Sequence, residues 1–166
     1  MKKQFFLCLL LLVQLQGLTQ AVKKMTAAEL NAFIAKSNQP MVISFWATWC
    51  GSCTEEIPYF ISTVQQKYKN EVALVLVSLD IKSYYPKKIE AFATRKNFTV
   101  PIIWMNESNA DIFCPAVDPG WTGAIPSTLM VNNSKQYRKF YEAGMSPLQF
   151  DRNLKLMLAG GGVASY

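Results

Sequence analysis

The chain has 166 residues, of which 51% are hydrophobic and 17% charged, and its formal net charge is +6. This length fits a single domain, and the apolar content excludes a disordered chain. The sequence contains no histidine, which excludes Ser-His-Asp triads, Cys-His dyads and histidine-ligated metal centres. Any acid–base catalysis must therefore come from carboxylates, tyrosine, lysine or the thiols of the four cysteines.

Residues 1–21 have the layout of a secretory signal peptide. Lys2 and Lys3 precede an unbroken apolar run over 5–13, and Thr19 and Ala21 place small side chains at the −3 and −1 positions of a cleavage site. This run is about half of the ~20 residues that a bilayer-spanning helix needs. We therefore expect cleavage and export to a periplasmic or other extracytoplasmic compartment, with membrane association only through an uncleaved leader. In an oxidising compartment, cysteines commonly serve as structural disulfides or redox groups.

The remaining chain, 22–166, is predicted to form one domain in which helices and strands alternate. Residues 105–124 are rich in Asn, Pro and Gly and are predicted to be an irregular insert. The order of elements predicts an α/β fold, a three-layer α/β/α sandwich with a mixed central sheet. Strands are predicted over 41–46, 72–79 and 100–104 and in a hairpin over 127–142, and helices from a capping box at 26–29, over 51–68, from Pro86 and over 148–158.

Cys50-Gly51-Ser52-Cys53 follows the first predicted strand and opens the next helix. Two cysteines with this spacing at a helix start can close a disulfide, and the free N–H groups and positive dipole end of the helix stabilise a thiolate. We therefore predict that Cys50 is the exposed nucleophile and Cys53 the deeper resolving thiol. Two other interpretations stay open. The pair could be half of a zinc site, for which Cys114 is the one further cysteine of the mature chain, or an inert structural disulfide.

The segment 45–53 (FWATWCGSC), with Pro58 five residues on, resembles the active-site segment of thioredoxin-fold proteins. The segment 125–129 (IPSTL) resembles their second landmark, where a cis-proline lies opposite the two cysteines. The run 53–59 (CTEEIPY) is most similar to the extracytoplasmic TlpA/ResA type, in which an acid at the position of Glu56 lies near the buried cysteine. The resemblance implies a thioredoxin-like domain over 22–166 and a redox-active Cys50–Cys53 pair.

The resemblance also implies roles for four other residues. Cytosolic thioredoxins carry a buried aspartate six residues before the first cysteine, where this chain has Ser44, so Glu56 is the candidate proton acceptor for the second thiol. The alternative is that Glu56 only favours the N-terminal half of its helix and faces water. Ile125 and Pro126 are expected to contact an extended substrate segment, and Trp49 to flank the exposed sulfur.

The role of Cys114 stays open between two interpretations. It is a buried free cysteine that only packs, or it lies in a loop that shapes the substrate groove and is close enough to influence the redox pair.

The function expected is thiol–disulfide exchange between the Cys50–Cys53 pair and protein substrates, with the protein acting as an extracytoplasmic reductant. An upstream, membrane-linked thiol donor would regenerate the dithiol. A dithiol oxidase or disulfide isomerase on the same fold is one alternative, and a soft-metal-binding chaperone module is another of a different class. A peroxidase is disfavoured because Ala47 stands where such relatives have threonine. No cofactor, metal site or nucleic-acid partner is indicated.

Overall fold

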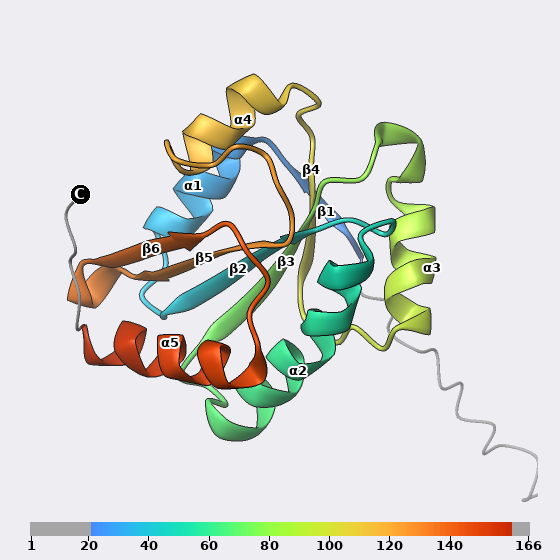
Figure 1. The fold of residues 1–166 in the computed structure, drawn as a ribbon. Helices are drawn as coiled ribbons and strands as arrows, with labels where there is room; N and C mark the ends of the chain where they lie inside the picture. Colours follow the sequence, from blue (N-terminus) through green and yellow to red (C-terminus); the bar gives the residue numbers. More distant parts are fainter. Residues whose placement is uncertain (1–20, 161–166) are drawn as a thin grey trace, which may run out of the picture.

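The computed structural model describes residues 21–160, which form a mixed six-stranded sheet with helices on both faces (Figure 1). The sheet order is β1-β4-β3-β2-β5-β6, in which β5 and β6 run antiparallel to their neighbours and the other pairs are parallel. This is the predicted three-layer α/β/α sandwich. The elements are β1 (Lys23–Met25), α1 (Ala27–Ala35), β2 (Met41–Trp46), α2 (Gly51–Lys67), β3 (Ala73–Ser78), η1 (Lys82–Tyr84), α3 (Lys87–Arg95), β4 (Ile102–Met105), α4 (Ala110–Val117), β5 (Ser127–Asn132), η2 (Asn133–Lys135), β6 (Tyr137–Tyr141) and α5 (Pro147–Ala159).

The central strands bring three connecting segments to one edge of the sheet. All of β2 is buried, and so is β3 beyond its first residue, which is the pattern of strands covered on both faces. The last residue of β2, Trp46, lies opposite Ser78 at the end of β3. Phe45 lies opposite Ser127 at the start of β5. The segments that follow β2 and β3, and the segment that precedes β5, therefore meet at the same edge.

Two hydrophobic clusters fill the space on either side of the sheet. Alternate residues of β2 point to opposite faces, so that Trp46 belongs to one cluster and Phe45 to the other. Helices α2, α3 and α5 cover the first face, and α1 and α4 cover the second (Figure 1). Phe60 of α2 and Phe150 of α5 are fully buried and stack with ring centroids 3.8 Å apart. This stack joins the two helices beneath their outer surface.

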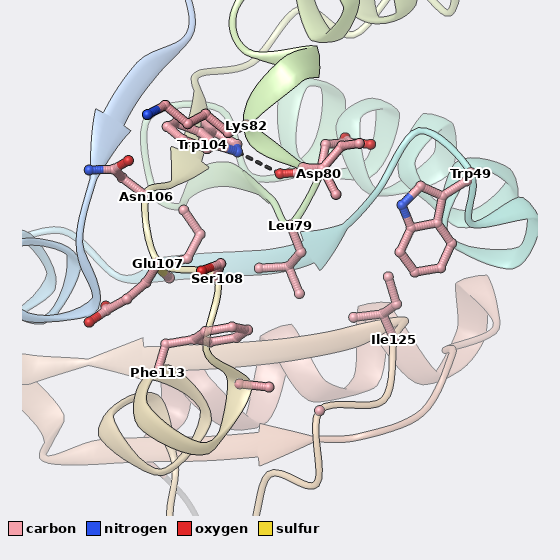
Figure 2. Close-up of a pocket in the computed structure, with 14 residues that line it drawn as sticks. Trp49, Leu79, Asp80, Lys82, Trp104, Asn106, Glu107, Ser108, Phe113 and Ile125 are labelled. Carbon is pink, nitrogen blue, oxygen red and sulfur yellow. Dashed lines mark hydrogen bonds between the residues drawn. The ribbon is translucent and has the colours of Figure 1, made fainter.

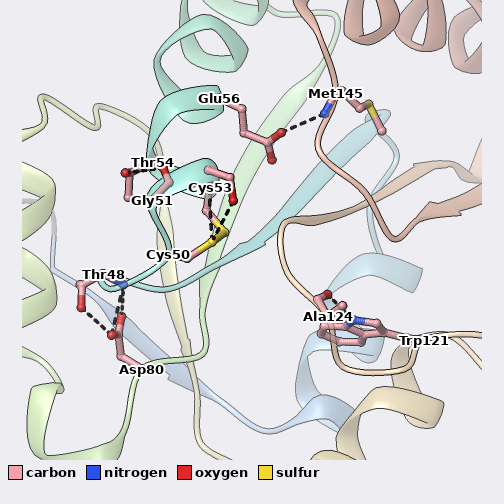
Figure 3. The surroundings of a disulfide bond; sticks show 11 residues. Thr48, Cys50, Gly51, Cys53, Thr54, Glu56, Asp80, Trp121, Ala124 and Met145 are labelled. Atoms are coloured by element: carbon pink, nitrogen blue, oxygen red, sulfur yellow. Dashed lines mark hydrogen bonds between the residues drawn. A yellow bond between two sulfur atoms is a disulfide. The ribbon is translucent and has the colours of Figure 1, made fainter.

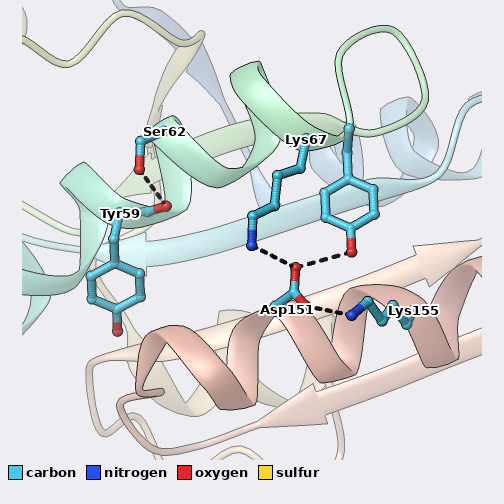
Figure 4. Close-up of polar contacts among 6 residues, drawn as sticks. Tyr59, Ser62, Lys67, Asp151 and Lys155 are labelled. Carbon is cyan, nitrogen blue, oxygen red and sulfur yellow. Dashed lines mark hydrogen bonds and ion pairs between the residues drawn. The ribbon is translucent and has the colours of Figure 1, made fainter.

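A polar cluster joins α2 and α5 at that outer surface (Figure 4). The Asp151 carboxylate accepts hydrogen bonds from the Tyr68 hydroxyl at 3.1 Å and from Lys67 at 3.4 Å, and it pairs with Lys155 at 2.8 Å. Both lysines are mostly exposed, and exposed ion pairs contribute at most about 1 kcal/mol. Packing of the buried aromatic side chains is therefore the main contact between the two helices.

The prediction of an irregular insert over 105–124 is wrong, because α4 lies within it. This helix begins after Asn109, whose side chain accepts a hydrogen bond from a backbone N–H two residues on. Phe113 and Val117 are buried in the second cluster, and Pro115 lies inside the helix without ending it. Tertiary packing thus overrides the low helix propensity that the Pro and Gly content suggests.

A second difference is β1, which was not predicted. It is a three-residue edge strand that pairs in parallel with β4, Lys24 lying opposite Trp104. Its charged residues give no strand pattern, because an edge strand depends on backbone pairing with its neighbour. The other predicted elements are confirmed with ends that differ by at most two residues. Except for Ala21, the predicted leader lies outside the described residues. No helix between residues 21 and 160 is long and apolar enough to cross a bilayer.

Candidate active site

Cys50 and Cys53 form a disulfide at the start of α2, with their Cα atoms 5.3 Å apart (Figure 3). Cys50 is the N-cap residue of α2, and its Sγ accepts a hydrogen bond from the Cys53 N–H at 3.3 Å. The Ser52 hydroxyl lies 3.7 Å from the same sulfur. A sulfur atom thus takes the place of the oxygen that usually caps a helix. Once the disulfide is reduced, the N–H, the hydroxyl and the helix dipole all favour a negative charge on Cys50.

The accessibility of the two cysteines follows the predicted order. Cys50 keeps 7% of its surface exposed and Cys53 keeps 1%. Even Cys50 is therefore more covered than the sequence suggests. Trp49, which precedes it, is 67% exposed. A partner that reaches the Cys50 sulfur therefore finds the exposed Trp49 side chain on the neighbouring residue.

A buried carboxylate holds the loop that leads into the disulfide. Asp80 follows β3 and is 4% exposed. Its oxygens accept hydrogen bonds from the Thr48 N–H at 3.1 Å and the Thr48 hydroxyl at 2.7 Å (Figure 3). They also accept one from the Ser78 hydroxyl at 2.8 Å. The Trp104 indole N–H donates to the Asp80 carbonyl at 2.7 Å. Sequence reasoning missed Asp80, although an acid directly after an apolar strand at this sheet edge is a usable signal.

Glu56 is buried one helical turn after Cys53, on the same side of α2. It is 4% exposed, so the interpretation that it faces water is wrong. Its Oε2 accepts the Met145 N–H at 3.0 Å, and its Oε1 is buried without a hydrogen-bond partner. Burial raises the pKa of Glu56 to about 7, while the Met145 hydrogen bond opposes the shift. Near neutral pH the carboxyl group can therefore both hold and release a proton.

Glu56 and Pro126 are neighbours across one glycine. A Cβ atom placed on Gly144 would lie 3.4 Å from Glu56 Oε2 and 3.4 Å from Pro126 Cγ. The Ile125–Pro126 peptide bond is cis, as the resemblance implies. Glu56 of α2 and Pro126, which are far apart in the sequence, thus lie close together in the structure.

Two hydroxyl groups are buried in the sheet on the α2 side. Ser44 of β2 lies opposite Thr128 of β5, and both residues are fully buried with hydroxyl oxygens that have no hydrogen-bond partner. Because side chains alternate along β2, Ser44 faces the same side as Trp46. The position at which cytosolic thioredoxins carry an aspartate therefore holds an uncharged polar pair, and the Glu56 carboxyl group is buried on the α2 side as well.

A second carboxylate orders the segment before Ile125. Glu142 Oε1 accepts hydrogen bonds from the Thr122 N–H at 2.9 Å, from the Thr122 hydroxyl, and from the Ala124 N–H at 3.0 Å. These bonds lower the pKa of Glu142. From the other side, the buried Trp121 donates its indole N–H to the Ala124 carbonyl at 3.0 Å. Neither Glu142 nor Trp121 was assigned this role from the sequence.

A hollow of about 370 Å³ opens beside Trp49. The apolar side chains of Trp49, Leu79 and Ile125 line one part of it, and Lys82 and Glu107 line another (Figure 2). Segment 105–124 contributes several lining residues, so it does shape the groove next to the predicted substrate-contact residues. Those lining residues include Met105, Ala110, Phe113 and Gly123.

Cys114 lies away from the redox pair in the architecture. It belongs to the cluster beneath α1 and α4, whereas Cys50 and Cys53 belong to the other cluster. It is 3% exposed and not disulfide-bonded, and burial raises the pKa of its thiol to about 11. These features favour the packing interpretation. Between residues 21 and 160, no group of three or more His, Cys, Asp or Glu side chains is arranged to hold a metal ion.

Comparison with known proteins agrees with this architecture. Residues 21–99 match the family model described as Thioredoxin. Thioredoxin-like protein YneN of Bacillus subtilis is 29% identical over 80 residues, which cover 48% of this chain and 46% of YneN. Thiol-disulfide oxidoreductase ResA of Geobacillus kaustophilus is 24% identical over 68% of this chain and 60% of ResA. The chain thus aligns with about half of the length of these curated relatives.

Solved structures share the fold over a larger part of the chain. The crystal structure of a thioredoxin-related protein from Neisseria meningitidis serogroup B superposes with a TM-score of 0.60 at 21% identity, covering 74% of this chain and 87% of that one. The mixed sheet and the disulfide at the start of α2 define a thioredoxin-like α/β protein. Residues 21–99 thus match the thioredoxin family model, and the described residues share the thioredoxin-like fold.

Replacing Glu56 by glutamine should change how stability depends on pH. The folded-state pKa lies above the unfolded value, so the contribution of Glu56 to stability is present below pH 4.5 and lost as the pH rises through about 7. Between pH 4.5 and 8 the free energy of unfolding of the oxidised wild type should fall by on the order of 3 kcal/mol relative to that of Glu56→Gln. Urea unfolding of both proteins measures this. Glu55→Gln, at the exposed neighbouring position, should follow the wild type, and parallel curves for all three would refute the assignment.

Removing the Glu142 carboxylate should impair substrate contact without changing the reactivity of Cys50. Glu142→Ala frees the 122–124 backbone, and misplacement of the adjacent Ile125 should lower the second-order rate of peptide disulfide reduction about 10-fold. Alkylation of Cys50 by iodoacetamide, which needs no peptide contact, should stay at the wild-type rate. Glu71→Ala, which removes an exposed acid after α2, is the matched control. Equal losses in both assays would mean that Glu142 only supports the fold.

Proposed function

We propose that this thioredoxin-like protein is a thiol–disulfide oxidoreductase that reduces disulfides of partner proteins outside the cytoplasm. The observation that carries the proposal is the position of Cys50, whose sulfur caps α2 while it is bonded to Cys53. The pattern of a leader over 1–21 supports the extracytoplasmic location. The resemblance of 53–59 to the TlpA/ResA type supports the reducing direction, and a thiol donor at the membrane would restore the dithiol.

The reaction follows from the chemistry of the two sulfurs. The Cys50 thiolate attacks one sulfur of the partner disulfide, forming a mixed disulfide and expelling the other partner sulfur as a thiolate. Cys53 then loses its proton and attacks the Cys50 sulfur, which releases the second partner thiolate and closes the Cys50–Cys53 bond. Two electrons pass to the partner, and its thiolates take up protons from solvent.

Glu56 is proposed to accept the proton of Cys53 in the second step. The carboxyl group is on the same side of α2, its pKa of about 7 leaves a sizeable carboxylate fraction at neutral pH, and its Oε1 has no competing partner. Release of product should therefore speed up as the pH rises through about 7 in the wild type. In Glu56→Gln the rate of product release should not show this increase near pH 7, whereas in Glu55→Gln it should.

The substrate segment is proposed to lie over Trp49 and Ile125. Both side chains line the hollow beside the disulfide, and an extended peptide can pair with the Ile125 backbone. Glu142 and Trp121 hold the preceding residues in place, so the contact surface is ordered before the partner binds.

The function is tested with reduced protein, a disulfide-linked peptide and three variants. Wild type should reduce the peptide, Cys53→Ala should accumulate a mixed disulfide through Cys50, and Cys50→Ala should do neither. Cys114→Ala is the control and should match the wild type, because Cys114 is buried and not disulfide-bonded. The proposal is abandoned if Cys50→Ala remains active.

The direction of exchange is tested by equilibration in redox buffers. A potential near −270 mV, the range of reductants, agrees with the proposal, whereas one near −180 mV or above assigns the protein to the oxidase or isomerase alternative. Retention of Cu(I) or Zn²⁺ by the reduced protein without any exchange activity would instead favour the metal-binding alternative.

A further inference from the structure

A basic surface lies beside the disulfide, on η1 and α3. Between residues 81 and 99 the chain carries five cationic side chains and one acid. All five cations are exposed. We call them the α3 basic surface, and they are Lys82, Lys87, Lys88, Arg95 and Lys96.

These cations have no acidic partners within the described residues. The ion pairs between residues 21 and 160 all involve Asp151, at the contact of α2 with α5. Nearby acids are already engaged by backbone groups, since Glu90 accepts the Val22 N–H at 3.3 Å and Glu107 accepts the Ala27 N–H at 3.0 Å. The α3 basic surface thus presents an excess of positive charge, with five cations against the carboxylates of Glu90 and Glu107, and none of those cations forms an ion pair within the described residues.

Helix stability does not account for this arrangement. Lys87 and Lys88 stand in the first turn of α3, where the positive end of the helix dipole disfavours cations. No side chain caps this end of the helix. Arg95 at the opposite end is favourably placed, but the two lysines work against the helix that carries them. An external anionic group would offset that cost.

The α3 basic surface adjoins the approach to Cys50. Lys88 and Arg95 line a hollow of about 370 Å³ together with Thr48 and Trp49. Lys82 lines the other hollow, which Trp49 also borders. Lys88 lies over the ring of Tyr84, another residue that lines the first hollow, with Nζ 4.2 Å from the ring centroid. Each of the two hollows that Trp49 borders is therefore lined by at least one cation, and the hollow with Lys82 is also lined by Glu107.

We propose that the α3 basic surface binds an acidic segment of the protein whose disulfide is exchanged at Cys50, an inference that rests on the proposed function. Trp49 is exposed next to Cys50 and lines both hollows, so a partner disulfide that covers Trp49 brings the residues flanking its cysteine close to Lys82 and Lys88. Acidic side chains there gain charge complementarity, which chiefly raises the rate of association and discriminates between partners. An anionic bilayer is the other candidate for such a surface, but it would not explain why the cations surround the route to the sulfur.

The test compares three disulfide-linked peptides that differ only in the residues flanking the cysteine, which are Glu, Gln or Lys. At about 20 mM salt the Glu peptide should be reduced roughly 10-fold faster than the Gln peptide, and the Lys peptide more slowly. The differences should largely disappear at about 0.5 M salt, where charges are screened. Equal rates for all three peptides would overturn the inference, while a complete absence of reduction would overturn the proposed function instead.

Two double variants test whether the preference for the Glu peptide depends on the α3 basic surface. Lys88→Glu with Arg95→Glu should reverse the preference, so that the Lys peptide reacts faster than the Glu peptide, with little change for the Gln peptide. Lys36→Glu with Lys69→Glu makes the same change in net charge after the C-terminal ends of α1 and α2 and should keep the wild-type preference. A preference that follows net charge in both pairs contradicts the inference. A membrane role would give a different result. The wild type would bind phosphatidylglycerol vesicles, and Lys88→Glu with Arg95→Glu would abolish this binding without altering the rates of peptide reduction. That result also contradicts the inference.

Discussion

The structure depends on the placement of one sulfur atom at the N-terminus of α2. A cap is needed because the first N–H groups of a helix have no partner within the helix, and here the Cys50 sulfur supplies it to the Cys53 N–H. The same contact that closes the helix also prepares the sulfur to carry negative charge after reduction. The cap can occupy this position because β2 is buried between β3 and β5. The sheet thereby fixes where β2 ends and α2 begins.

Three carboxylates around this point show how environment assigns different roles to one chemical group. Asp80 is buried but surrounded by donors, so it acts as a fixed support for the Thr48 loop. Glu142 is half-buried and accepts three hydrogen bonds, and its pKa is lowered. Glu56 has one donor and one unpartnered oxygen in a buried position, and its pKa is raised. Two carboxylates thus order the backbone on either side of the disulfide, while the third is suited to proton transfer.

Local patterns in the sequence predicted most of the fold and the centre of the site. The apolar run of β2, the capping box at Thr26 and the CxxC spacing depend on neighbouring residues alone, so they can be recognised without a structure. What was missed depends on tertiary contacts. Helix α4 forms because Phe113 and Val117 pack into the second cluster despite Pro115, and β1 forms because β4 offers it backbone groups. Asp80 and Glu142 reach loops that lie 32 and 18–20 residues away in the chain. The place of Asp80 after an apolar strand marks it as a candidate, but no local pattern identifies the loop that either carboxylate holds.

The central claim is that the start of α2 stabilises a thiolate on Cys50, and iodoacetamide alkylation of the reduced protein as a function of pH tests it most directly. Mass mapping distinguishes the modified cysteines. The account predicts that Cys50 is modified first and that its alkylation rate is half-maximal well below the value of about 8.5 for an ordinary thiol. Modification of Cys53 before Cys50, or a half-maximal rate at or above that pH, would contradict it.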